Sequence, residues 1–140
     1  MPKTWSIKNQ LELKIVAEHL LDARPRLIAL TGPLGAGKTT LTKEIGKLLG
    51  IKQALTSPTY VLEQIYHIHD HKDFHFLVHV DCYRLKDRYE LPALDLEHWL
   101  SLDKTLVIIE WADKIKPWLE KFQPVWVKIQ ITGASRIVSF

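Results

Sequence analysis

A glycine-rich octapeptide is the part of this chain whose residue types and spacing point most directly to chemistry. It reads Gly32-Pro33-Leu34-Gly35-Ala36-Gly37-Lys38-Thr39 and follows a short apolar run. In the pattern G-x-x-x-x-G-K-[ST], glycines allow a tight turn, so that successive backbone N–H groups and the positive end of the next helix face phosphate oxygens. The octapeptide therefore predicts a nucleoside triphosphate site, with Lys38 reaching the β and γ phosphates and the Thr39 hydroxyl binding Mg²⁺.

Two acidic residues are candidates for a second magnesium ligand. A loop of this kind requires a carboxylate at the end of a neighbouring buried strand. Asp81 ends the apolar run 76–80, and Glu110 ends the run 106–109. An acid at such a position can also simply mark where a buried strand reaches water, so the sequence predicts that at least one of the two is functional.

Aromatic and imidazole side chains next to these acids have two interpretations each. His79, Asp81 and Tyr83 alternate and so share one side of a strand. His79 could help Asp81 to orient a water or to contact Mg²⁺ through water, or it could be a core histidine with satisfied hydrogen bonds. Trp111 could cover a nucleotide or fill the core.

A histidine-rich stretch raises the question of zinc. Its members are His67, His69, His71, His75 and His79. We expect no zinc there, because the residues surround a predicted hairpin tip and no second cysteine supports them.

Composition limits the remaining possibilities. The chain has 140 residues, 46% of them hydrophobic, which predicts a single domain over 1–140. A formal charge of +3 would suit a polyanionic partner without demonstrating one. Cys82 is the only cysteine, so an intramolecular disulfide is excluded. Because no run reaches the roughly 18 apolar residues of a membrane span, we expect a cytoplasmic protein with no membrane contact.

Hydrophobic periodicity predicts alternating helices and strands, followed by hairpins. The expected helices are 9–21 and 39–49, with one or two short helical pieces in 88–100 and a short helix or turn in 113–121 interrupted by Pro117. The expected strands are 27–30, 60–68, 74–81, 106–109, 125–131 and 136–140. The buried face of the first helix is expected to carry Leu11, Ile15, Val16, Ala17, Leu20 and Leu21. This order predicts an α/β fold, a three-layer sandwich of the P-loop NTPase type with a mixed, mostly parallel central sheet plus hairpins.

Four segments together closely resemble the TsaE (YjeE) family. They are the loop 32–40, Ser57-Pro58-Thr59-Tyr60, the segment 79–85 and Ile109-Glu110-Trp111. Their order and spacing match as well, and the resemblance covers nearly the whole chain. Members of this family are small P-loop (Walker A) ATPases required for making threonylcarbamoyladenosine at position 37 of tRNAs.

The resemblance implies a role for each candidate residue. The residues implied in ATP binding are Gly32, Leu34, Gly35, Ala36, Gly37, Lys38, Thr39, Thr40 and Trp111. Thr39 and Glu110 are implied as Mg²⁺ ligands, and Asp81, Lys38 and Glu110 as the catalytic set. The candidates for a nucleotide-sensing switch or a partner contact are Ser57, Pro58, Thr59, His79, Tyr83 and Arg84. The chain departs from the family at Pro33, which lacks an N–H to donate to phosphate.

The resemblance also implies partners. Family members are weak ATPases when isolated and act with a TsaD-like transferase subunit and a TsaB-like scaffold subunit, with tRNA reached through the complex. The contact to the base end of the nucleotide cannot be placed, because the spacing around residues 8–10 permits more than one alignment.

Other functions use the same loop. A small-molecule kinase would transfer the γ-phosphate to a metabolite, although no arginine-bearing lid is evident. A nucleotide-gated scaffold without catalysis is a further alternative. A GTPase is excluded, because Asn9 is the only asparagine and the guanine-reading N-K-x-D element is therefore missing.

Overall fold

One seven-stranded mixed sheet organises the molecule. The computed structural model describes residues 2–55, 63–84 and 95–140. In these ranges the strands are β1 (Thr4–Ile7), β2 (Leu27–Thr31), β3 (Glu63–His67), β4 (Phe76–Asp81), β5 (Thr105–Glu110), β6 (Val125–Thr132) and β7 (Ser135–Ser139). Their order across the sheet is β1-β7-β6-β2-β5-β4-β3.

The four central strands run in one direction. The pairs β6–β2, β2–β5 and β5–β4 are parallel, whereas β4–β3, β6–β7 and β7–β1 are antiparallel. Parallel strands place their carboxyl ends at one edge of a sheet. Thr31, Asp81 and Glu110, which end β2, β4 and β5, therefore meet at that edge, with Asp81 directly opposite Glu110.

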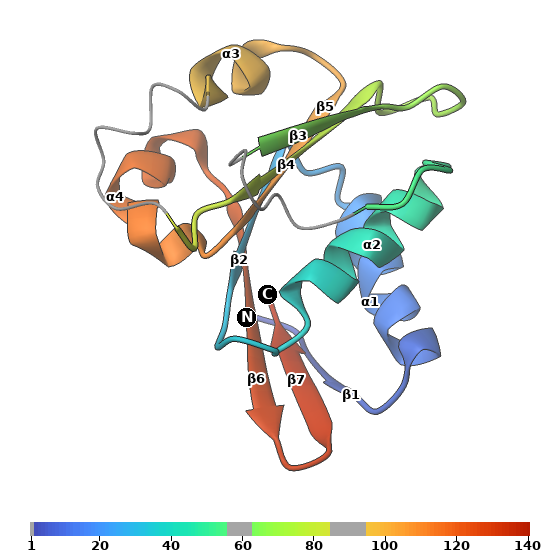
Figure 1. The fold of residues 1–140 in the computed structure, drawn as a ribbon, viewed down its shortest axis with the longest axis vertical. Helices are drawn as coiled ribbons and strands as arrows, with labels where there is room; N and C mark the ends of the chain where they lie inside the picture. Colours follow the sequence, from blue (N-terminus) through green and yellow to red (C-terminus); the bar gives the residue numbers. More distant parts are fainter. Residues whose placement is uncertain (1, 56–62, 85–94) are drawn as a thin grey trace.

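Helices cover both faces of the sheet. The helical elements are α1 (Gln10–Asp22), α2 (Lys38–Leu48), α3 (Leu96–Ser101), η2 (Ala112–Ile115), α4 (Lys116–Leu119) and η3 (Glu120–Phe122). Figure 1 shows α1 and α2 on one side of the strands, with α3 and α4 on the other. Each side has its own apolar core, so the predicted three-layer α/β sandwich with a mixed sheet is confirmed.

Local sequence explains where the first two helices begin and end. The Asn9 side chain accepts a hydrogen bond from the Glu12 N–H (3.0 Å), while the Glu12 carboxylate accepts one from the Lys8 N–H (2.6 Å). This reciprocal capping fixes the start of α1. The second helix ends before Gly50, which has a φ of +78° and so acts as the glycine stop expected there.

Most predicted elements are confirmed, and two predictions need correction. Leu11 and Ile15 are not on the buried face of α1: their exposed fractions are 68% and 44%, and Leu13 is buried instead. Strand β1 was not predicted. It is held by pairing with β7 from the other end of the chain, which no local pattern reveals. The predicted segments that reach residues 56–62 and 85–94 lie partly outside the described residues.

No described helix is long enough for a membrane span; α1, at 13 residues, is the longest of them.

Candidate nucleotide-binding site

The glycine loop, residues 32–37, connects the end of β2 to the start of α2. Gly37 is the N-cap of α2 with a φ of +110°, a left-handed conformation that glycine adopts without strain, and it has no side chain to cap the helix. Gly32 has a φ of +148°, and a Cβ there would lie 2.4 Å from the Ile129 carbonyl oxygen. The loop can therefore pass this close to β6 only with glycine at position 32.

Lys38 reaches back into the loop from the first turn of α2. Its Nζ donates hydrogen bonds to the carbonyl oxygens of Gly32 (2.6 Å) and Pro33 (2.9 Å) and lies 4.0 Å from the centroid of the Trp111 ring. Burial lowers the pKa of Lys38, opposed by the nearby carboxylates of Glu110, Asp81 and Asp113. The Lys38 ammonium group is thus held at the loop by two backbone carbonyl oxygens, which other hydrogen-bond acceptors can replace.

Thr39 and Glu110 meet directly. The Thr39 hydroxyl lies 2.8 and 3.0 Å from the two carboxylate oxygens of Glu110 and donates to this carboxylate. Glu110 is buried at the end of β5, so a paired carboxylate is held in a largely dry position. A hydroxyl beside a carboxylate offers hard oxygen ligands, the type that Mg²⁺ prefers.

His79 lies behind this pair. Its ring is fully buried on β4, and its Nε2 lies 2.5 Å from Glu110 Oε2. An ionised carboxylate only accepts hydrogen bonds, so Nε2 donates to Glu110. His79 Nδ1 is buried and has no hydrogen-bond partner within the described part of the chain. His79 is therefore a core residue that fixes Glu110, with only one of its two ring nitrogens satisfied.

Asp81 lies at the rim, one strand away from Glu110. Its Oδ1 accepts a hydrogen bond from the Tyr83 N–H (2.8 Å). Burial is the main cause that raises the pKa of Asp81, and Glu110 adds to it, while the Tyr83 hydrogen bond, His79 and Lys38 oppose it. A carboxylate with a raised pKa accepts a proton more readily than an ordinary aspartate.

These side chains line one hollow of about 230 Å³, which we call the loop hollow. Its residues are Leu34, Gly35, Gly37, Lys38, Thr39, Thr40, Asp81, Tyr83, Glu110 and Trp111. The Tyr83 and Trp111 rings lie 5.0 Å apart, and the Lys114 ammonium group donates to the Tyr83 carbonyl. Residues predicted from three separate stretches of sequence thus surround one space.

A second hollow of about 330 Å³ continues from the loop hollow, and we call it the Arg136 hollow. Both are lined by Gly35, Gly37 and Thr40. Its other residues are Ile7, Lys8, Asn9, Gln10, Leu13, Ala36, Ile129, Ala134, Arg136 and Val138. It brings together the start of α1 and the β6–β7 hairpin, on either side of the glycine loop.

The remaining predicted site residues lie elsewhere. Ala36 is buried and lines the Arg136 hollow, while Gly32 lines a third hollow on the far side of the loop. Arg84 is exposed just beyond Tyr83. The predicted switch residues Ser57, Pro58 and Thr59 lie outside the described residues. Asn9, Gln10 and Arg136 were not predicted to share a hollow. The polar run before the first helix is a signal for Asn9 and Gln10, but no local pattern connects Arg136 to them.

Together these features define an α/β protein in which a glycine loop, a buried hydroxyl–carboxylate pair and a rim aspartate surround one hollow at the carboxyl edge of parallel strands. Residues 7–138 match the model of the family described as "Threonylcarbamoyl adenosine biosynthesis protein TsaE". The chain belongs to the TsaE family.

Individual relatives agree with this. The chain is 43% identical to the Streptomyces coelicolor protein named "tRNA threonylcarbamoyladenosine biosynthesis protein TsaE" over 62% of this chain, and this match spans 57% of that protein. It is 35% identical to the Bacillus subtilis protein of the same name over 80% of this chain and 68% of that one. The crystal structure of Bacillus subtilis YdiB superposes with a TM-score of 0.74 at 26% identity, covering 100% of this chain and 84% of that one.

Proposed function

We propose that this chain binds ATP with Mg²⁺ and hydrolyses it as a subunit of the machinery that makes threonylcarbamoyladenosine in tRNA. The observation that carries the proposal is the meeting of the Thr39 hydroxyl and the Glu110 carboxylate beside the glycine loop. The names of the TsaE relatives support the pathway, although the match spans little more than half the length of the Streptomyces coelicolor protein.

The residues present fit a magnesium ion. Thr39 and Glu110 supply a hydroxyl and a carboxylate in contact, and His79 holds the carboxylate from behind. The hydrogen bond from Thr39 would be given up when both groups turn their oxygens to the metal. Mg²⁺ bound there would neutralise charge on the phosphates.

The residues around the loop also fit a triphosphate. The N-terminal end of α2 and the Lys38 ammonium group provide positive charge on one side of the loop hollow. Among the described residues, Lys38 is held by two backbone carbonyls and the Trp111 ring, so it can exchange these contacts for phosphate oxygens.

Asp81 is the residue that we assign to the water. It lines the same hollow as Lys38 and Thr39, and its raised pKa suits a group that takes up a proton from an attacking water. Positioning and neutralisation of charge by the surrounding groups would supply most of the catalysis.

The Arg136 hollow suits the base and ribose. It opens from the glycine loop on the side away from Asp81 and Glu110, and Asn9, Gln10 and Arg136 give it amide and guanidinium groups. Apolar side chains from β1, α1 and β7 form the rest of its wall, as expected where a flat ring is buried.

The partners remain those that the family implies, a TsaD-like and a TsaB-like subunit. In this proposal they perform the transfer of the threonylcarbamoyl group, and this chain supplies ATP hydrolysis to their assembly.

Calorimetry with ADP and ATP in the presence and absence of Mg²⁺ tests the binding. Lys38→Ala should abolish tight binding, and Glu110→Ala should remove its Mg²⁺ dependence. Asp81→Asn should spare binding and lower turnover. Lys14→Ala, on the exposed side of α1, is the control and should change none of these. A well-folded protein that gives no heat with either nucleotide would refute the proposal.

Radiolabelled ATP separates hydrolysis from kinase activity, because a kinase leaves the label on an acceptor whereas an ATPase releases phosphate. Turnover measured with and without the two partner subunits, together with modified adenosine in tRNA as the readout, then tests the pathway. Repeated rounds of modification with a nonhydrolysable ATP analogue would favour the nucleotide-gated scaffold.

A further inference from the structure

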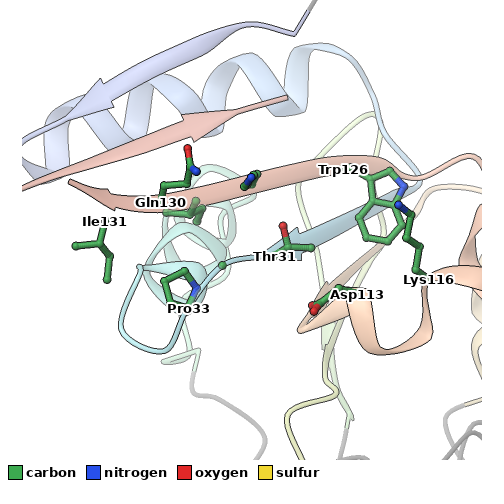
Figure 2. A pocket seen from close by; sticks show the side chains of 10 residues that line it. Thr31, Pro33, Asp113, Lys116, Trp126, Gln130 and Ile131 are labelled. Atoms are coloured by element: carbon green, nitrogen blue, oxygen red, sulfur yellow. The ribbon is translucent and has the colours of Figure 1, made fainter.

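The largest hollow we describe lies outside the loop hollow, and we call it the Trp126 groove. It measures about 700 Å³ and is lined by Thr31, Gly32, Pro33, Asp113, Lys116, Trp126, Lys128, Ile129, Gln130 and Ile131. Figure 2 shows Trp126 and Lys116 together at one end, with Pro33, Gln130 and Ile131 at the other. Of the residues assigned to ATP binding, Gly32 alone lines this groove.

The groove continues onto a sheet face that the described helices do not cover. Residues 126, 128 and 130 alternate along β6 and share that face. The core under α3 and α4 draws its strand residues from β2, β4, β5 and β6, with none from β7 or β1. Figure 1 shows β6 and β7 extending beyond α3 and α4.

Most side chains on this face beyond Trp126 are polar, with Ile137 as the exception. In the sheet register Lys128 lies beside Ser139, and Ser139 beside Thr4. In the next row Gln130 is followed by Ile137 and Ser6. Hydroxyl, amide and ammonium groups therefore extend across three strands from the groove.

At the inner end of the groove an aromatic ring accompanies positive charge. Trp126 is half-buried against the second core, and the Lys116 Nζ lies 5.7 Å from its ring centroid. Lys128 is exposed one step along the same face, and Asp113 is the one acidic residue in the lining. An indole beside two ammonium groups is the combination that stacks a nucleobase while neutralising its phosphates.

We propose that the Trp126 groove binds a single-stranded segment of RNA, with a base against Trp126 and the adjoining phosphates at Lys116 and Lys128. Hydroxyl and amide side chains on the open strands then contact ribose and base edges. An acidic protein segment would use the same lysines, but the strand face beside the groove carries mostly hydroxyl and amide side chains and gives apolar side chains of such a segment little to pack against. The choice of RNA rests on the proposed role in tRNA modification.

Fluorescence anisotropy with a labelled single-stranded oligoribonucleotide of about ten residues, at about 50 mM salt and without nucleotide or partners, tests this directly. The doubly substituted Lys116→Glu, Lys128→Glu protein should bind at least about tenfold more weakly, with a shallower salt dependence. Lys14→Glu, Lys52→Glu makes the same change in charge on exposed residues outside the groove and should bind RNA much as the unmodified protein does.

Trp126 is tested separately from charge. Trp126→Leu should weaken RNA binding about tenfold without changing its salt dependence, and Trp126→Phe should retain most of it, because a ring remains for stacking. Circular dichroism and the ADP affinity of each variant establish that the fold and the ATP site are intact, so failure of this proposal and failure of the ATP proposal are distinguishable.

Three results would overturn the RNA groove: no RNA binding by the unmodified protein, equal binding by the groove and control variants, or competition by poly-glutamate as effective as competition by unlabelled RNA of equal charge. The last result would assign the groove to an acidic protein segment.

Discussion

The hydrogen bond between His79 and Glu110 allows a quantitative test of how the site is built. Replacing His79 by Leu keeps an apolar side chain of similar size but leaves the buried Glu110 carboxylate with one partner fewer. A hydrogen bond to a charged group contributes about 1.5–3 kcal/mol. We therefore expect His79→Leu to lower the free energy of unfolding by about that amount or more.

A double-mutant cycle isolates the bond from other effects of the substitution. In a Glu110→Leu background no carboxylate remains, so His79→Leu should cost little there. The coupling energy should be about 1.5–3 kcal/mol. Urea unfolding of the four proteins at pH 7.5, without nucleotide, measures it.

A neutral hydrogen bond in the same region sets the scale. The Thr42 hydroxyl donates to the Lys38 carbonyl oxygen (3.0 Å), and Thr42→Val should cost only about 0.5–1.5 kcal/mol. His79→Leu should also raise the Mg²⁺ concentration needed for nucleotide binding, since Glu110 loses its support. Additivity of the two substitutions within about 0.5 kcal/mol would show that the bond contributes nothing and would refute this reasoning.

Three further predictions concern the loop, the Cys82 thiol and the Glu63 carboxyl group. Gly32→Ala should lower the free energy of unfolding by about 2–5 kcal/mol, measured in urea, because the new Cβ would lie 2.4 Å from the Ile129 carbonyl oxygen. The control Gly35→Ala, whose Cβ would meet nothing within 4 Å, should cost distinctly less. Equal losses would contradict the close approach at Gly32. Burial raises the pKa of Cys82 to about 12, so the folded protein should resist alkylation at pH 8 and react only on unfolding, and reaction at the rate of a free thiol would disprove this. Burial, aided by Asp95, raises the pKa of Glu63 from 4.5 to about 7 against a hydrogen bond from Trp99, so the unfolded chain ionises first and stability falls as pH rises from 4.5 to 7. Glu63→Gln should therefore be more stable than the unmodified protein at pH 8, by about 1 kcal/mol after allowance for partial exposure, but not at pH 4, as urea unfolding at both values would reveal.

Elements with a strong local signal were predictable from the sequence. The apolar runs of β2 and β5 predicted two buried strands, the first leading into the glycine loop, in a mostly parallel sheet. The structure contains both, paired in parallel. Helix α1 was also predicted, and Val16, Ala17 and Leu20 lie on its buried face as expected, whereas Leu11 and Ile15 were wrongly placed there. Leu11 and Ile15 lie four apart, as do Leu13 and Ala17, so spacing alone allowed two faces, and only packing against α2 selects one.

Long-range pairing set the limit of prediction for the fold and for the candidate site. Strand β1 exists because Thr4 pairs with Ser139, at the other end of the chain. The Arg136 hollow has the same origin, since Gln10 and Arg136 meet only once β1, β6 and β7 have assembled. The contact between Thr39 and Glu110, by contrast, follows from two local motifs. Thr39 lies at the start of α2, and Glu110 lies at the end of the central strand β5. The roles assigned to these residues remain predictions.

The two carbonyl groups that hold Lys38 have a thermodynamic consequence. Gly32 and Pro33 line the Trp126 groove on one side of the loop, and on the other side their oxygens accept hydrogen bonds from the ammonium group proposed to hold phosphate. A ligand that draws Lys38 away would remove these two hydrogen bonds from backbone that also lines the groove. Thermodynamic linkage makes the coupling reciprocal. If bound ATP changes the affinity of the groove for its ligand by some factor, a ligand in the groove changes the affinity for ATP by the same factor. The loop would then couple the affinities of the protein for two ligands as well as binding one of them.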